Sequence, residues 1–354
     1  MNASKDLNSF FRNEPPGERT NSIRWLQKMV MAQSINLPRD FKSKEDWEVF
    51  KNKIRTELPG TIGIPSFPPL KPSYTRARIR IGPDVILERV DVYVDGDYSI
   101  PAFVFSPLNP PSDPMPALLW NPGWNCDKWD RAGQELAVRI VRNGFVVLIL
   151  DHAPFGETTP FTAQEKWHTG MTQIMSMGVV LGISQLALRC AETRRVGEYL
   201  RSRPDVDPKR VAISGLCQGG QDTWLSAALD DQFCAAAPFC SETTFLVHGA
   251  EMGSYWAHAD SSPYPFGILK ICDIDHLHAS IAPRPLLVRS NLPDQWWPIS
   301  GFDDVETFTR KIYRLYSAED RVDFRAEVHE HNITGPFVDA LEAFLLKYVK
   351  PKPE

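Results

Sequence analysis

One ten-residue stretch, residues 211–220 with the sequence VAISGLCQGG, constrains the fold more than any other part of the chain. Its apolar, partly β-branched start and its Gly-x-Cys-x-Gly-Gly end predict a buried strand that turns sharply into a helix over 221–229. Glycines are needed there because larger side chains two positions either side of the cysteine would collide. The N-terminus of the helix would favour a thiolate and later an oxyanion. The pattern therefore predicts that Cys217 is a nucleophile, although a buried structural cysteine would also fit it.

The composition of the 354 residues is that of a globular protein that can bury a large core. Hydrophobic residues make up 43% and charged residues 23%, which fits one large α/β domain with an extension, or two domains. The net charge of −5 gives no basic surface, so we expect no nucleic-acid partner. The six cysteines show no CxxC spacing, which favours reduced thiols over disulfides or a zinc site.

No stretch of the sequence predicts a signal peptide or a membrane span. Residues 1–21 are polar and lack the apolar segment that a signal peptide needs. The longest mostly apolar stretch, residues 175–188, contains polar residues and is too short to cross a bilayer. We therefore expect a cytoplasmic protein without a membrane partner.

The pattern of the chain changes at about residue 75. Residues 20–57 carry helical periodicity in two segments, and Ser43 is a candidate N-cap of the second. Residues 58–74 hold five prolines and two glycines, which predicts an extended linker. We therefore expect a helical extension with a proline-rich linker over residues 1–74 and a catalytic domain over 75–354.

From residue 75 the sequence predicts a sheet. Residues 75–106 alternate as strands do, and Asp95-Gly96 predicts a hairpin turn between 85–93 and 98–106. Short apolar runs separated by helix-length segments then predict buried parallel strands covered by helices. The runs are 117–120, 145–150, 211–214, 235–239 and 286–288, and the helices are expected at 131–143, 180–201 and 337–349.

Three further motifs carry a resemblance to a known family. They are DVDPKR at 205–210, APRPLL at 282–287 and His331-Asn332-x-Thr334 before the last helix. Together with the predicted order of strands, they resemble the α/β-hydrolase branch that contains dienelactone hydrolases and acetyl-xylan-esterase-like proteins, over roughly residues 85–350. The resemblance implies an α/β-hydrolase fold, with a mostly parallel central sheet, an antiparallel N-terminal edge and helices on both faces. A cysteine nucleophile is similar to dienelactone hydrolase, whereas the esterase-like relatives use serine, and this departure leaves the substrate open.

The resemblance implies the chain order nucleophile, acid, histidine. Asp294 follows the strand at 286–288, where an acid can reach a histidine Nδ1–H, although an aspartate after proline is also common in turns. Of the two histidines after the last expected strand, 324–328, His331 is favoured over His329 because related enzymes place theirs just before the closing helix. The alternative acids are Asp303, Asp304 and, less strongly, Glu242.

The backbone N–H groups of Gln218 and Trp124 are expected to form an oxyanion hole. Gln218 follows the nucleophile, and NPGWN at 121–125 resembles the family's His-Gly loop, although an ordinary Pro-Gly turn would look the same. Aromatic-rich loops between the expected strands could cover the site and select the substrate, or their aromatic side chains could simply pack against one another. The tentative substrate-binding residues are His152, Trp167, Tyr255, Trp256 and Trp296.

Together these features predict a cysteine-dependent hydrolase of a carboxylic ester or lactone, with a Cys217-His331-Asp294 triad and an acyl-enzyme intermediate. Residues 272–278 carry side chains that metals accept, but they also predict a helix start, and we expect no metal and no cofactor. The expected partner is a small-molecule ester or lactone, and a homodimer is compatible with the sequence. Two alternatives stay open: an acyltransferase or cyclase using the same thioester, and a non-catalytic small-molecule-binding homologue.

Overall fold

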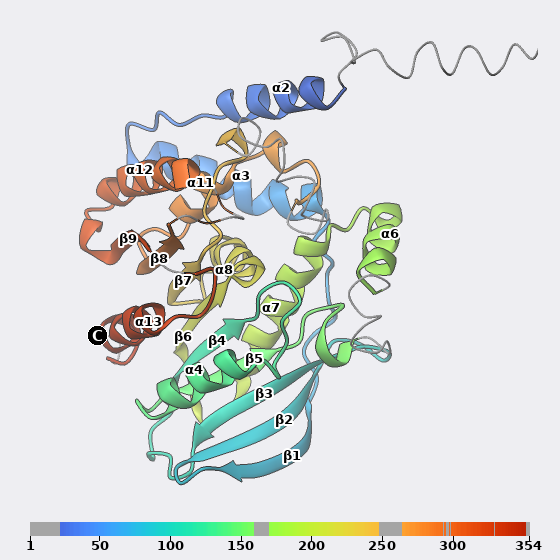
Figure 1. The fold of residues 1–354 in the computed structure, drawn as a ribbon, viewed down its shortest axis with the longest axis vertical. Coiled ribbons are helices and arrows are strands. Elements are labelled where there is room, and N and C mark those ends of the chain that lie inside the picture. The colour runs from blue at the N-terminus through green and yellow to red at the C-terminus, as the bar shows by residue number, and fades with distance from the viewer. Residues whose placement is uncertain are drawn as a thin grey trace, which may run out of the picture.

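The computed structural model describes residues 22–158, 170–247, 264–292, 294, 297, 299–328 and 330–351 (Figure 1). Within these residues a nine-stranded sheet has the strand order β1-β2-β3-β5-β4-β6-β7-β8-β9. The strands are β1 Tyr74–Ile81, β2 Val85–Tyr93, β3 Ser99–Pro107, β4 Met115–Asn121, β5 Val146–Leu150, β6 Val206–Leu216, β7 Ala235–Phe239, β8 Leu286–Asn291 and β9 Val322–Glu327.

The sheet begins antiparallel and continues parallel, as the sequence predicts. β1, β2, β3 and β5 pair successively in antiparallel register. β5, β4, β6, β7, β8 and β9 then pair in parallel. The predicted hairpin turn is confirmed, because the Asp95 carboxylate accepts hydrogen bonds from the N–H groups of Asp97 and Tyr98. Since the parallel strands all point the same way, the loops that follow them meet at one edge of the sheet.

Helices cover both faces of this sheet, and each face has its own apolar core. α4 (Arg131–Val141) and α13 (Gly335–Tyr348) pack on one face. α7 (Gln185–Ser202), α8 (Gln218–Leu229), α11 (Ile274–Ala279) and α12 (Ile299–Leu315) pack on the other (Figure 1). The neighbours Leu118 and Leu119 on β4 belong to opposite cores, as the period of two in a strand requires.

The N-terminal extension packs into the core of the sheet. It forms α2 (Ser22–Ile35) and α3 (Lys44–Ile62), and the predicted N-cap is confirmed because Ser43 Oγ accepts from the Asp46 N–H. The buried side chains of α3 belong to the same apolar cluster as the strands. α3 passes through Pro59 and ends at Gly63, where φ is 77°. The prediction that the linker begins at residue 58 is therefore wrong, since its first residues are helical.

The predicted start of the helix at 180–201 is also wrong. The chain forms two helices there, α6 (Met171–Leu181) and α7. Gly182, with φ 70°, ends α6, and Ser184 caps α7 by accepting from the Ala187 N–H. Among the described helices no single one is long and apolar enough to cross a membrane; α6 and α7 meet that test only together, as a pair bent by 95°.

Candidate active site

Cys217 lies in a strained turn between a strand and a helix. β6 ends at Leu216 and α8 begins at Gln218, and Cys217 between them has φ 59° and ψ −120°. Residues other than glycine rarely adopt this conformation, so the surrounding structure must impose it. The backbone N–H of Cys217 is held by the Phe239 carbonyl oxygen at 2.8 Å. The strand-turn-helix that the sequence predicts around the cysteine is confirmed.

Two glycines allow this turn to lie against the end of β4. A Cβ atom on Gly215 would lie 2.3 Å from the carbonyl oxygen of Gly219, and one on Gly219 would lie 2.0 Å from that of Asn121. The loop after β4 continues this contact, because a Cβ on Gly123 would lie 3.6 Å from the Cβ of Cys217. The glycine spacing seen in the sequence is therefore a requirement of close backbone packing.

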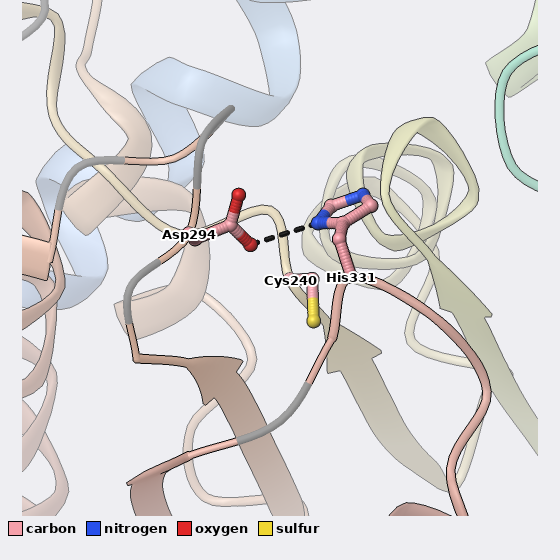
Figure 2. A group of neighbouring side chains, drawn as sticks. All are labelled: Cys240, Asp294 and His331. Atoms are coloured by element: carbon pink, nitrogen blue, oxygen red, sulfur yellow. Dashed lines mark hydrogen bonds and ion pairs between the residues drawn. The ribbon is translucent and has the colours of Figure 1, made fainter.

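Asp294 and His331 form a hydrogen-bonded pair at the ends of neighbouring strands (Figure 2). Asp294 follows β8, and His331 lies in the loop between β9 and α13. Oδ2 of Asp294 lies 2.8 Å from Nδ1 of His331, and the Asp294 side chain is fully buried. Oδ1 of Asp294 accepts from the backbone N–H of Trp297 at 3.1 Å. The structure thus brings together the acid and the histidine chosen from the sequence.

The Cys217 side chain also influences the His331 ring. Burial lowers the pKa of His331, but the hydrogen bond with Asp294 and the interaction with the Cys217 side chain outweigh it and raise that pKa to about 10. Nε2 of His331 is buried, and no described residue forms a hydrogen bond of full geometry with it. The contact with Cys217 is therefore loose, as is common before substrate binds.

Comparison with known proteins finds similar hydrolases and esterases. Residues 100–249 match the family model described as "Dienelactone hydrolase family". The Bacillus subtilis (strain 168) protein named "Putative hydrolase YtaP" is 25% identical over 260 residues, which cover 69% of this chain and 81% of that protein. A structure from Bacteroides fragilis NCTC 9343, described as a "putative acetyl xylan esterase", superposes with a TM-score of 0.70 at 18% identity, covering 85% of this chain and 81% of that one.

A third similar protein is the "Glucuronoyl Esterase from Solibacter usitatus", with a TM-score of 0.63 and 15% identity, covering 86% of this chain and 93% of that one. The fold is that of an α/β-hydrolase. The class of enzyme predicted from the sequence, a carboxylic ester hydrolase, agrees with these matches. They leave open which residue of this α/β-hydrolase acts as the nucleophile.

The alternative acids have other surroundings in this α/β-hydrolase. Asp303 and Asp304 occupy exposed positions of α12. Glu242 is buried, and its carboxyl oxygens accept from the backbone N–H and the hydroxyl of Ser241 at 2.8 and 2.7 Å. Burial raises the pKa of Glu242 to about 8, so it is mostly uncharged at neutral pH. Asp294 is therefore the acid that the geometry favours, and His329 lies outside the described residues.

A second thiol, Cys240, lies beside the Asp294–His331 pair (Figure 2). Burial raises the pKa of Cys240 well above its ordinary value, and the neighbouring carboxyl groups of Glu242 and Asp294 raise it further. Cys240 therefore stays protonated, which leaves Cys217 as the candidate nucleophile. Sequence reasoning missed Cys240 because tertiary pairing brings it there: β7 pairs with β8, and the Cys240 N–H donates to the Arg289 carbonyl oxygen at 2.8 Å.

The two candidate oxyanion donors, Gln218 and Trp124, belong to the start of α8 and to the loop after β4. Gln218 opens α8, where the first N–H groups of a helix have no acceptor within the helix. Trp124 follows Gly123, which touches Cys217, and its half-buried ring packs edge-on against Phe155 with the ring centroids 6.2 Å apart. The role of Gln218 and Trp124 as oxyanion donors stays a prediction.

Arg189 on α7 ties the loop after β4 to α8. Its Nη2 donates to the carbonyl oxygen of Pro122 at 2.9 Å, and its Nε and Nη2 bind the Asp222 carboxylate at 2.5–3.1 Å. Both side chains of this ion pair are fully buried. Because Pro122 precedes Gly123 and Trp124, Arg189 links the predicted oxyanion loop to the helix behind the nucleophile. Nothing in the sequence marked Arg189 or Asp222.

His152 belongs to the same buried network. Its Nδ1 pairs with the Glu192 carboxylate at 2.9 Å, and its Nε2 with Oδ1 of Asn121 at 3.1 Å. Burial lowers the pKa of His152 well below its ordinary value. The ring is buried and both nitrogens have partners, and the tentative role of His152 in substrate binding stays a prediction. The other tentative residues, Trp167, Tyr255, Trp256 and Trp296, lie outside the described residues.

Residues 272–278 form a buried structural unit around α11. Asp273 caps α11 in a capping box with His276. Asp275 pairs with Arg39 at 2.6 Å, and Nε2 of His276 lies 2.9 Å from the carbonyl oxygen of Pro38. These contacts join the extension to the sheet domain, in agreement with the predicted helix start.

Proposed function

We propose that the protein hydrolyses a carboxylic ester or lactone through a thioester on Cys217. The observation that carries the proposal is the convergence of three strand-end loops: the strained turn holding Cys217, and the Asp294–His331 pair joined at 2.8 Å. Nucleophile, base and orienting acid in this arrangement are the parts that acyl transfer needs. The match to the dienelactone hydrolase family and the fold shared with esterases support the same chemistry.

In the first half of the proposed reaction, the Cys217 thiolate attacks the carbonyl carbon. The oxyanion that forms is held by the backbone N–H groups of Gln218 and Trp124, each worth roughly 10²–10³ in rate. The His331 imidazolium then gives its proton to the leaving oxygen, and the carbon–oxygen bond breaks. The product is an alcohol, or the opened ring of a lactone, and a thioester on Cys217.

Thioester formation prepares His331 for the second half. The Cys217 side chain is one of the groups that raise the pKa of His331. Acylation removes the negative charge from the sulfur, so the pKa of His331 falls and the ring becomes a neutral base. It takes a proton from water, which attacks the thioester and releases the acid and the thiolate. Asp294 holds the tautomer that this proton transfer requires.

The proposed mechanism needs a reduced thiol. All six cysteines are free, including those that lie close to Cys217. Free thiols persist in reducing compartments, so the proposal fits a cytoplasmic enzyme.

The deciding experiment is to trap the thioester and test its dependence on His331. We expect intact-protein mass spectrometry after mixing with 4-nitrophenyl acetate to show one acetyl group, mapped to Cys217, which turns over in wild type. Cys217→Ala should lower kcat by about 10⁴-fold or more, whereas Cys234→Ala at the far end of β7 should behave as wild type.

Iodoacetamide labelling measured over a pH series tests the activated thiol separately. We expect rapid labelling of Cys217 near neutral pH that slows in His331→Ala. Labelling as slow as that of an ordinary thiol, and indifferent to His331, would contradict the proposal and favour a non-catalytic binding protein. Transfer of the acetyl group to an added alcohol or amine in preference to water would favour an acyltransferase.

A further inference from the structure

Three side chains at the site carry atoms that can bind a metal ion. The proposed hydrolysis does not use them as metal ligands. Sγ of Cys240, a carboxylate oxygen of Asp294 and a ring nitrogen of His331 all lie within 4.8 Å of one another (Figure 2). Within the part of the chain that the structure describes, this is the one group of three His, Cys, Asp or Glu side chains at such distances. Hydrolysis needs Asp294 and His331, but it gives Cys240 no task.

The donor types and their spacing suit zinc. Zn²⁺ binds thiolate, imidazole and carboxylate at about 2.0–2.3 Å, so its ligands lie roughly 3.5 Å apart. Donor atoms within 4.8 Å of one another can reach that spacing by small side-chain movements, since each comes from a different strand-end loop. The charges also match, because one thiolate and one carboxylate neutralise a divalent cation in a site where Cys240 and the Asp294 side chain are fully buried.

We propose that Cys240, Asp294 and His331 bind Zn²⁺ reversibly and that this inhibits the enzyme. The cation replaces the Cys240 thiol proton and the proton shared by Asp294 and His331. Both protons pass to solvent, and no electrons are transferred. While the cation is bound, His331 cannot accept or donate the proton that hydrolysis requires. The inhibition rests on the proposed function of Asp294 and His331, whereas the binding of the cation does not.

Binding is tested with cobalt, which gives a thiolate-to-metal absorption band when sulfur is a ligand. The background is Cys217→Ala, which removes the nucleophile thiol while leaving all three proposed ligands. We expect one Co²⁺ per chain with a thiolate band, displaced by Zn²⁺. In this background, a second substitution, Cys240→Ala, should abolish the band, whereas Cys234→Ala as the second substitution should not. Absence of the band in Cys217→Ala, or its persistence without Cys240, would overturn the proposal.

Inhibition is tested on the active enzyme with 4-nitrophenyl acetate and Zn²⁺ buffered by a chelator. Loss of a residue that only supports a metal ligand typically weakens metal binding roughly 10–100-fold. Because Cys240 is itself a proposed ligand, Cys240→Ala should weaken inhibition by Zn²⁺ by more than this. Basal hydrolysis by Cys240→Ala should stay near wild type, and near-UV circular dichroism checks its fold. Equal zinc sensitivity of wild type and Cys240→Ala would place the cation on Cys217 and overturn the proposal. Cobalt binding without any ester hydrolysis would instead refute the proposed function alone.

Discussion

His331 changes its charge according to the side chains next to it. Its pKa of about 10 in the folded protein lies above the ordinary value of 6.5, since the partners Asp294 and Cys217 outweigh burial. A raised pKa means that the protonated ring stabilises the fold fully below pH 6.5, and that this contribution is lost as the pH rises through 10. One pKa unit corresponds to about 1.4 kcal/mol, so the whole effect is a few kcal/mol at most.

We therefore predict how the stability of His331→Gln compares with wild type across pH. The wild-type advantage in the free energy of unfolding should be largest near pH 6 and should shrink towards pH 10.5, as measured by urea unfolding. Asp294→Asn loses the partner that raises the pKa most strongly, so its stability should vary less over this range. An advantage that is the same at pH 6 and pH 10.5 would show that the ring is not protonated in the folded enzyme.

The residues found from the sequence alone are those whose signal is local. Cys217 is a candidate in the sequence because the glycines around it follow from the geometry of one turn. Asp294 and His331 were recognisable because they follow strands in the order that the resemblance implies. Arg189 carries no such signal, since its partner carbonyl on Pro122 is 67 positions away in the chain. The partners of His152 carry no such signal either, because Asn121 and Glu192 come from other elements.

At the scale of elements, the end of β4 packs against the turn that holds Cys217. This packing leaves no room for a side chain on Gly219. We predict that Gly219→Ala, whose Cβ would lie 2.0 Å from the Asn121 oxygen, costs about 1–3 kcal/mol or more and displaces Cys217. Gly60→Ala is the matched control, since Gly60 lies within α3 with nothing inside 4 Å of its Cβ position. It should stabilise the protein by roughly 0.5–1 kcal/mol. Thermal unfolding and iodoacetamide labelling of Cys217 measure both effects, and an unchanged Gly219→Ala would contradict the packing.

The link from α7 to the loop after β4 predicts a kinetic effect of Arg189. Lysine keeps the positive charge next to Asp222 but cannot bind Asp222 and the Pro122 carbonyl together. We therefore predict that Arg189→Lys lowers kcat about 10- to 100-fold with little change in KM. This loss of kcat is smaller than that expected from removing an oxyanion donor. Arg284→Lys is the control, because Arg284 also donates to backbone carbonyls, those of Ala227, Asp230 and Phe233, away from the loop. It should lower stability and leave kcat unchanged. Equal kcat losses in the two variants would indicate a general effect on folding.

Sequence patterns located the strands well and the helix ends less well. Strands in this sheet are short apolar runs between turns, and their positions follow directly from burial on both faces. The break between α6 and α7 was missed because apolar residues continue across Gly182, where only the backbone conformation ends the helix. α12 was not expected at all, although it is amphipathic, with its buried side chains repeating along one face.

For the whole molecule, the question is whether the extension before residue 75 folds as a separate unit or as part of the sheet domain. Trp47 on α3 is fully buried, with its ring 5.0 Å from that of Phe41 and 5.9 Å from that of Phe308 on α12 (ring centroids). Lys51 donates to the carbonyl oxygen of Ala282 at 2.9 Å, and Arg55 to that of Ala228 at 3.0 Å. The extension thus contacts α12, α8 and the segment before β8, which predicts that it unfolds together with the sheet.

Trp47→Ala tests this cooperativity. It should lower the free energy of unfolding by about 3–5 kcal/mol and keep a single transition in urea, monitored by both circular dichroism and hydrolysis. Trp25→Ala, at a position on α2 that is 60% exposed, should change stability by no more than about 0.5 kcal/mol. Two separate transitions in Trp47→Ala, with hydrolysis surviving the first, would show that the extension folds apart from the catalytic domain. A single transition means that the helices before residue 75 unfold together with the sheet that carries Asp294 and His331.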